Sequence, residues 1–200
     1  MLFDFNKQKA SIENDAKSGD AAKLHSFLDM HMRKIESIKD LAGHPPRENE
    51  CYFLWTLNSF NAFTFIPYLI KEHGHIDELT VSTYSINTRI ADSFMRHLSQ
   101  GSIAKVKILL AESMSYRMPK VVDHLKMSLA DHPSASITYG WNHSKITLVR
   151  SGDHHYVIEG SGNWSENAAH EQYIFINSPE IYAFRRSHID AVRPRKSSKG

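Results

Sequence analysis

Residues 141–177 contain two apolar, alternating segments joined by a short polar turn, and this pattern constrains the fold more than any other part of the chain. The first segment covers residues 146–150 and the second residues 155–159, with the tripeptide Ser-Gly-Asp at 151–153 between them. Alternation is typical of β-strands, and a glycine beside an aspartate is typical of the turn that joins two strands. We therefore expect a β-hairpin whose two outer ends lie together at one edge of a sheet.

Four polar side chains lie where the outer ends of this hairpin are expected to meet. His143 and Lys145 come before the first strand, and Ser161 and Asn163 follow the second. Since side chains two positions apart share one face of a strand, each pair points the same way and the four groups converge. The ammonium would supply positive charge, the hydroxyl and amide would donate hydrogen bonds, and the imidazole could attack phosphorus or carry a proton. This combination suits a phosphoryl ligand.

The same residues form two short motifs that together resemble the phospholipase D superfamily. Residues 143–145 read H-S-K and match the family's HxK, and residues 160–163 read G-S-G-N and match its GSxN. Glu171 matches an acidic residue that the family often has shortly after the second motif. An HxK alone occurs by chance in many chains, whereas HxK followed at near-correct distance by GSxN is much more specific. The alternative, an ordinary surface hairpin with a glycine-rich turn, leaves the second motif unexplained.

The chain departs from the family pattern at one position. After HxK and four further residues the family has an aspartate, and this chain has Arg150. The spacer before Gly160 is also longer than usual, and the nearest acidic residue is Asp153, inside the expected turn. Strand alternation places Arg150 on the face opposite His143, so it need not disturb the site. If the family's aspartate has a structural role, activity survives its absence; if it tunes the imidazole, activity is weakened or lost.

Length and composition are those of a single α/β domain. The chain has 200 residues, of which 41% are hydrophobic, and its formal net charge of +2 does not by itself indicate a nucleic-acid partner. The single cysteine, Cys51, excludes an intrachain disulfide and is expected in the core of a protein from a reducing compartment. The sequence shows neither a signal-peptide pattern nor an apolar stretch long enough to span a membrane, so we expect the cytoplasm.

The N-terminal part of the chain predicts an extra helix. In residues 11–42, apolar residues such as Leu24 and Leu28 recur near helical spacing, and Gly43 with the following prolines ends the pattern. We interpret residues 1–48 as an accessory helix and connector outside the family resemblance. Such a helix could pack on the domain, mediate self-association or cover the site, and packing is the favoured interpretation.

Residues 49–190 are expected to form the catalytic domain, and residues 191–200 a basic, disordered tail. Besides the hairpin, the expected strands are residues 52–57, 78–85, 104–110, 136–139 and 172–177. The expected helices are residues 58–72, 87–100, 118–131 and 179–189. The strand–helix–strand order across 78–110 predicts a parallel βαβ unit.

His73-Gly74-His75 could hold a metal, but without a third ligand at suitable spacing a polar turn is favoured. The predicted fold class is α/β, a mixed β-sheet flanked by helices on both faces, as in phospholipase D.

The resemblance covers roughly residues 51–190 and implies a reaction mechanism. His143 would attack phosphorus to give a covalent phosphohistidine, with no metal and no other cofactor, and Glu171 would orient its imidazole. The substrate-binding residues would be Lys145, Ser161, Gly162, Asn163 and Ser165. A helix starting at Ser165 would also aim its positive end at the anion site.

The same chemistry needs a second histidine to protonate the leaving oxygen. Because the chain contains the motif pair once, we predict a homodimer whose two-fold axis brings the two sets of motif residues face to face in a composite active site. If one chain acted alone, His155 and His170 would be the first candidates for the acid.

The sequence therefore predicts a metal-independent phosphodiesterase, with a nuclease acting on DNA or RNA as the preferred function. That preference rests on resemblance to small, single-motif bacterial endonucleases of the family. Hydrolysis of phospholipids or other phosphodiesters is a second hypothesis, ranked lower because no amphipathic basic stretch indicates stable membrane association. A third is a catalytically silent module that keeps the phosphate site as a nucleic-acid contact.

Overall fold

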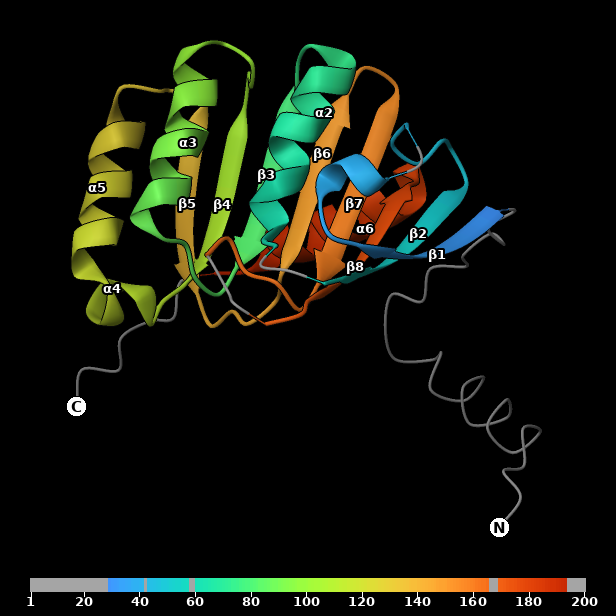
Figure 1. Cartoon of the computed structure of the whole chain (residues 1–200). Coiled ribbons are helices and arrows are strands. Elements are labelled where there is room, and N and C mark those ends of the chain that lie inside the picture. Colours follow the sequence, from blue (N-terminus) through green and yellow to red (C-terminus); the bar gives the residue numbers. More distant parts are fainter. Residues whose placement is uncertain (1–28, 42, 58–59, 166–168, 194–200) are drawn as a thin grey trace, which may run out of the picture.

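The computed structural model describes residues 29–41, 43–57, 60–165 and 169–193, which form a mixed eight-stranded sheet with helices on both faces (Figure 1). The strands are β1 (Asp29–Ile35), β2 (Glu50–Thr56), β3 (Glu78–Thr83), β4 (Val106–Ala111), β5 (Ala135–Gly140), β6 (Ile146–Ser151), β7 (His154–Gly160) and β8 (Gln172–Asn177). The helices are α2 (Phe65–His73), α3 (Thr88–Ser99), α4 (Met114–Arg117), α5 (Pro119–Ala130) and α6 (Pro179–Ala191), with short 3₁₀ helices η1 (Ile38–Asp40) and η2 (Ala62–Thr64). The predicted α/β class with a mixed sheet is confirmed.

The strand order brings both motifs to one edge of the sheet. The order is β1-β2-β8-β7-β6-β3-β4-β5, in which β3, β4 and β5 are parallel and β6, β7 and β8 alternate in direction. The ends of β3, β5 and β7 therefore lie beside the starts of β6 and β8. We call this the motif edge, made of residues 83–85, 141–145 and 160–165, and it is the lower edge of the sheet in Figure 1.

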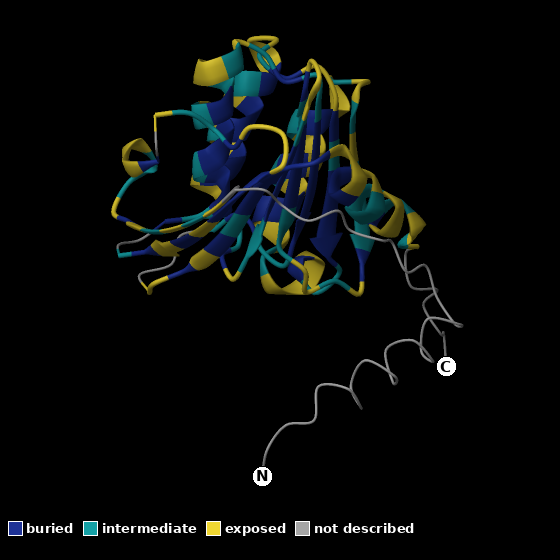
Figure 2. Cartoon of the chain, turned by 90° about the vertical axis from the view of Figure 1, so that its right-hand side faces the viewer, coloured by how far each residue is buried: buried dark blue, intermediate teal, exposed yellow. Residues whose placement is uncertain are grey.

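Two apolar clusters hold the layers together. Helices α2, α3 and α5 cover one face of the sheet, and α6 covers the other over β6 and β7. Figure 2 shows the buried residues concentrated on the strands and on the inward sides of the helices. In α3, Ile90, Phe94 and Leu98 share one buried stripe at helical spacing, and Asn87 caps the helix by accepting from the backbone N–H of Ile90 at 2.9 Å. The predicted βαβ unit is present, with β3 and β4 parallel.

The predicted hairpin is confirmed. Ser151 pairs with His154, so Gly152 and Asp153 form the loop, and the φ of 55° at Gly152 lies in the left-handed region that glycine adopts without a steric penalty. This turn lies at the end of the strands opposite the motif edge. Cys51 is buried as expected, and burial raises the pKa of its thiol to about 11.

The helix predicted for residues 11–42 is wrong where the structure can test it. Residues 29–35 form strand β1, which pairs in parallel with β2 along its whole length and places Ile35 in the core. The apolar pattern of these seven residues is as compatible with a strand as with a helix, and backbone pairing with β2 decides in favour of the strand. Of the tail predicted for residues 191–200, Ala191 belongs to α6 and Val192 packs against the apolar cluster beside α6. Residues 1–28 and 194–200 lie outside the described residues, and the boundary at residue 49 stays a prediction.

Two smaller differences concern helices. The helix expected from residue 58 begins at Phe65, after the 3₁₀ turn η2, and the four-residue helix α4 was not expected. His73-Gly74-His75 ends α2: His73 hydrogen-bonds the hydroxyl of Tyr156 at 2.9 Å, and His75 the carbonyl of Gly101 at 3.1 Å. Among the described residues, no helix has the length and apolar character to cross a membrane.

Candidate active site

His143 and Lys145 lie together in the loop between β5 and β6. The Nζ atom of Lys145 lies 3.3 Å from Nδ1 of His143 and donates to the His143 carbonyl oxygen at 3.0 Å. Partial burial lowers the pKa of Lys145, while Glu171 and Tyr84 act on it in the opposite direction. The imidazole of His143 is exposed and accessible to a ligand.

This loop is fixed to strand β3 by hydrogen bonds of its polar residues. The amide of Asn142 donates to the carbonyl oxygen of Thr83 at 3.2 Å, and its oxygen accepts from the backbone N–H and the hydroxyl of Ser144. The hydroxyl of Ser144 also lies 2.6 Å from that of Ser82. The middle residue of HxK therefore ties this loop to the sheet.

The two glycines of the second motif are required by close packing. A Cβ atom at Gly160 would overlap the backbone of Gln172, and one at Gly162 would overlap the hydroxyl end of Tyr173. Tyr173 is itself held in place, because its hydroxyl donates to the carbonyl oxygen of Phe60 at 3.1 Å. The path of the chain between β7 and β8 thus depends on both glycines.

Ser161 contacts Glu171 in the structure. Its hydroxyl donates to the Glu171 carboxylate and accepts from the backbone N–H of Gln172 at 3.0 Å. Glu171 is only 5% exposed, and its backbone N–H donates to the hydroxyl of Thr56 at 2.8 Å. A hydroxyl has one hydrogen, so Ser161 must leave Glu171 before it can donate to a phosphoryl oxygen. The orientation of His143 by Glu171 stays a prediction.

Asn163 is joined to the first motif through Tyr84. Its side-chain oxygen accepts from the backbone N–H of Tyr84 at 3.2 Å and from the hydroxyl of Thr83 at 3.4 Å. With that oxygen engaged, the amide nitrogen is the group that can donate to a ligand. The ring of Tyr84 lies 4.6 Å from the ring of His143 and 5.8 Å from Nζ of Lys145. Tyr84 therefore connects the two halves of the predicted site.

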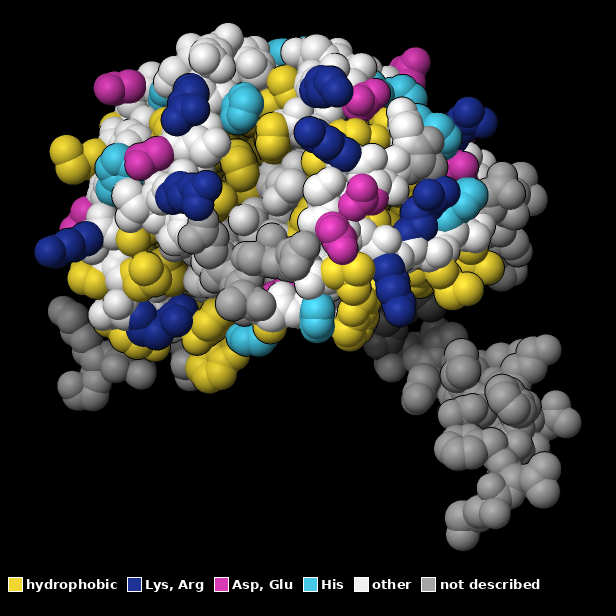
Figure 3. Space-filling model, viewed as in Figure 1, with side chains coloured by type: hydrophobic (Ala, Val, Ile, Leu, Met, Phe, Trp, Pro, Cys, Tyr) yellow, Lys and Arg dark blue, Asp and Glu magenta, His cyan; other side chains and the backbone are white. Residues whose placement is uncertain are grey.

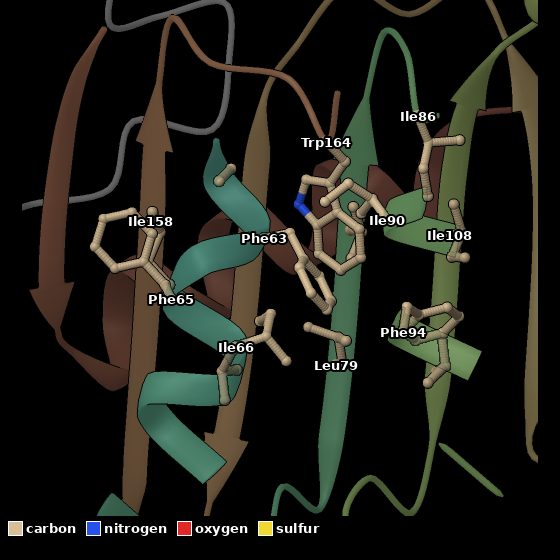
Figure 4. Packing of buried hydrophobic residues seen from close by; sticks show 14 of the residues in the cluster. Phe63, Phe65, Ile66, Leu79, Ile86, Ile90, Phe94, Ile108, Ile158 and Trp164 are labelled. Carbon is tan, nitrogen blue, oxygen red and sulfur yellow. The ribbon is translucent and has the colours of Figure 1, made fainter. Parts of the chain in front are cut away.

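Trp164 anchors the second motif in the core. Figure 4 shows its ring among Phe63 and other apolar side chains, and it is 1% exposed. Its indole nitrogen donates to Thr147 at 3.0 Å, and its backbone N–H donates to Thr83 at 3.2 Å. The position of Asn163 thus follows from the burial of the next side chain.

Sequence reasoning assigned no role to Tyr84 or Trp164. Ser85, the residue after Tyr84, also reaches the site, since its hydroxyl lies 2.9 Å from that of Ser165. The signal that could have found Trp164 is its place directly after the GSxN motif. The helix expected from Ser165 falls mostly on residues 166–168, outside the described residues, and Ser165 and Ala169 themselves are not helical.

Other acidic and histidine candidates lie in different places. Asp153 is in the β6–β7 turn, and His155 packs against Tyr182 of α6 with ring centroids 5.2 Å apart, both away from the motif edge. His170 hydrogen-bonds the carbonyl oxygen of Thr56 at 2.9 Å, beside Glu171. Of the two alternative acids, His170 is the one near the site.

Arg150 lies near the far end of β6, where it forms an ion pair with Asp77 at 3.4 Å. We expect Arg150→Asp to change turnover by less than about tenfold, or about 1.4 kcal/mol. Loss of this half-exposed ion pair alone, as in Arg150→Gln, should lower stability by no more than about 1 kcal/mol, and Arg150→Asp should lower it further because its carboxylate would repel that of Asp77. Arg150→Gln is the matched control, since it removes the ion pair without placing a second carboxylate beside Asp77. Steady-state kinetics and thermal unfolding check both values, and an inactive wild type that gains turnover in Arg150→Asp would favour the silent module.

Comparison with known proteins gives fold-level similarity only. Neither the family models nor the curated proteins that were compared match the sequence. A polyphosphate kinase from Porphyromonas gingivalis superposes with a TM-score of 0.48 and 13% identity, covering 74% of this chain and 27% of that one. A phosphatidylserine synthase from Haemophilus influenzae Rd KW20 gives a TM-score of 0.44 and 10% identity, covering 69% of this chain and 37% of that one. The chain thus spans well under half of either structure, and at this similarity neither assigns it a function.

Proposed function

We propose that the chain is a metal-independent phosphodiesterase of the phospholipase D superfamily, and that it is a nuclease cleaving DNA or RNA. The observation that carries the proposal is the arrangement at the motif edge: His143 contacts Lys145, and Tyr84 links both to Asn163. A nucleophile, a cation and an amide donor held close together are what phosphoryl transfer needs.

The proposed reaction has two steps. His143 attacks phosphorus, an N–P bond forms, and the P–O bond to the leaving group breaks while a second histidine protonates the departing oxygen. Water then attacks the phosphohistidine, the same second histidine takes its proton, and the N–P bond breaks to release the product and restore His143. Lys145 and Asn163 would stabilise the charge that develops on the phosphoryl oxygens.

The contact between Lys145 and His143 has a consequence for this reaction. An imidazole whose Nδ1 faces an ammonium accepts there, so its hydrogen is on Nε2. If His143 attacks phosphorus through Nε2, that nitrogen must carry no hydrogen, so the reaction requires the tautomer with its hydrogen on Nδ1. We therefore expect Lys145 to move from Nδ1 to a phosphoryl oxygen when substrate binds, which frees Nδ1 to carry the proton.

The proposal includes a homodimer, because a single chain has one copy of the motifs. On the α6 side of the sheet, the outer strands expose Met32 (87%) and Trp55 (47%). A cavity of about 960 Å³ runs from these side chains to Lys145. A second copy seated over this surface would cover apolar area and would adjoin the site. The cytoplasm remains the proposed compartment, on the ground of the single cysteine.

Activity in the presence of a chelator tests the proposal directly. We expect the protein to cleave single- or double-stranded DNA, RNA or bis(4-nitrophenyl) phosphate at the same rate with and without EDTA, because the cationic Lys145 takes the part that Mg²⁺ often has in phosphoryl transfer. Product release with EDTA present is the measurement. Loss of activity on chelation, restored by Mg²⁺ or Mn²⁺, would contradict the phosphohistidine mechanism. Cleavage of a phospholipid in place of any nucleic acid would support the lipid hydrolase.

A further inference from the structure

A second cavity opens directly beside His143. It has a volume of about 420 Å³, and its lining includes Tyr84, Glu112, Tyr116, Trp141 and His143. This volume is at the lower end of the range for small-molecule sites and suits a single planar group and its sugar. His143 is part of the cavity wall. A substrate group that occupies the cavity would therefore lie next to the phosphorus atom that His143 attacks.

Two large aromatic side chains at this cavity are exposed to solvent. Trp141 is 79% exposed and Tyr116 is 74% exposed. They come from different parts of the chain, since Trp141 lies two residues before His143 and Tyr116 lies in α4. Figure 3 shows hydrophobic side chains and histidines along the lower edge of the molecule, where these loops lie. Exposed aromatic rings around a concave site are suited to stacking against a flat ligand.

A cationic side chain lies against Tyr84, one of the residues that line the cavity. Arg117 lies over the ring of Tyr84, with its guanidinium carbon 4.3 Å from the ring centroid. It is held there by hydrogen bonds to the Ser113 hydroxyl at 3.3 Å and the Tyr84 carbonyl oxygen at 3.5 Å. Arg117 and Lys145 both lie within about 6 Å of the centre of the Tyr84 ring, and both would attract a polyanionic backbone.

Polar groups in the lining distinguish a base from a lipid. Glu112, Ser113 and Asn142 contribute to the wall. The Glu112 carboxylate can accept from the amino group of a base, and the Ser113 hydroxyl can donate to its carbonyl, whereas the amide of Asn142 is already engaged with the carbonyl oxygens of Thr83 and Leu109. By contrast, an acyl chain would offer the Glu112 carboxylate and the Ser113 hydroxyl no hydrogen-bond partner.

We propose that this cavity is a stacking subsite for one unpaired nucleobase next to the cleaved phosphodiester, so that the substrate is single-stranded nucleic acid. The inference rests on the proposed phosphodiesterase activity and narrows its substrate. A base inside a duplex is stacked on its neighbours and cannot enter a cavity between Trp141 and Tyr116, whereas an unpaired base can. Stacking is tolerant of sequence, since every base has a flat face.

Two substrates with the same leaving group and the same charge test this subsite. They are thymidine 5′-(4-nitrophenyl phosphate) and methyl 4-nitrophenyl phosphate, which differ in the nucleoside. We expect Trp141→Ala and Tyr116→Ala each to lower kcat/KM for the thymidine ester about 10- to 100-fold, the scale of losing one stacked base. Hydrolysis of the methyl ester should stay within about twofold of wild type. Trp141→Phe keeps a ring and should retain most of the activity.

Met127→Ala is the matched control, because Met127 is 75% exposed but belongs to α5 and does not line the cavity. Equal losses on both esters would overturn the inference, since they would mean that Trp141 only positions His143. Unchanged kinetics on both esters would overturn it as well. So would loss of binding to phosphatidylglycerol vesicles in Trp141→Ala with nucleotide hydrolysis unchanged, which would assign the rings to a membrane.

Binding separates the failure of this inference from the failure of the proposed function. In a His143→Ala background, a short fluorescein-labelled thymidine oligonucleotide is compared with an abasic one of equal length and charge. Tighter binding of the thymidine strand, lost in Trp141→Ala, supports the subsite even if the wild type hydrolyses no diester. Equal binding of both strands overturns the subsite even if the wild type is active.

Discussion

Replacing His143 by alanine is expected to abolish phosphodiester turnover, with a loss of at least about 10⁴-fold, the scale seen when an enzyme loses its nucleophile. In the proposed mechanism the imidazole forms the N–P bond, and no other group described at the motif edge is placed to replace it. The fold should be unaffected, because His143 is exposed and its loop is held by Asn142 and Ser144. Initial rates on bis(4-nitrophenyl) phosphate, together with thermal unfolding, check both parts.

Trapping the intermediate is the accompanying control. Alkaline quenching of wild type with a ³²P-labelled diester should give acid-labile label on the protein, and the His143→Ala variant should give none. Lys145→Ala and Asn163→Ala should each lower kcat about 100-fold, the effect of losing one donor to the developing charge. A His143→Ala variant that turned over at the wild-type rate would exclude His143 as the nucleophile.

The hairpin and the convergence of its ends could be predicted because both depend on local rules. Alternation fixes which side chains share a face, and the Ser-Gly-Asp turn fixes the register, so residues 143–145 and 160–163 had to come to one edge. The βαβ unit at 78–110 followed in the same way from a strand, a capped helix and a second strand in close succession.

Strand β1 could not be predicted, because its structure depends on a distant partner. Its residues Met30, Met32 and Lys34 alternate with His31 and Ile35, but the segment before it suggested helical spacing. Pairing with β2 decides between the two, and this is a contact that no local window contains. The same limit applies to the short helix α4, whose four residues give no periodic signal.

The sequence predicted which residues belong to the site better than it predicted what each of them contacts. Tyr84 reaches His143 and Asn163 because β3 pairs with β6, which joins segments about sixty residues apart, and no motif marks that contact. Ser161 was assigned to the substrate, yet its hydroxyl donates to Glu171. A motif specifies which residues are present, whereas hydrogen-bond partners depend on the loops that pack around it.

A mixture of wild type and the His143→Ala variant is expected to be less active than its wild-type chains would be if they acted independently. If each composite site uses His143 of one protomer as nucleophile and His143 of its partner as acid, a mixed dimer lacks one of the two and should be at least about 100-fold impaired. After subunit exchange between equal amounts of the two proteins, random pairing leaves about a quarter of the dimers with two wild-type chains. Activity should therefore be about a quarter of that of pure wild type at the same total protein concentration. A titration with the variant should therefore follow the square of the wild-type fraction, while independent sites would follow the fraction itself.

The assembly itself provides the control for this titration. Sedimentation should show about twice the 22.9 kDa chain mass. Two Lys145 side chains facing each other across the axis would repel unless an anion lies between them, so phosphate or sulfate should strengthen the dimer and chloride at equal ionic strength should not. Trp55→Lys on the apolar outer strands should weaken the dimer, because it places a charge in the surface that the second copy is proposed to cover. A protein that sediments as a monomer at assay concentration and retains full activity would exclude the shared site, and His170→Ala would then be the first test for a general acid within one chain, since His170 lies beside Glu171 at the site.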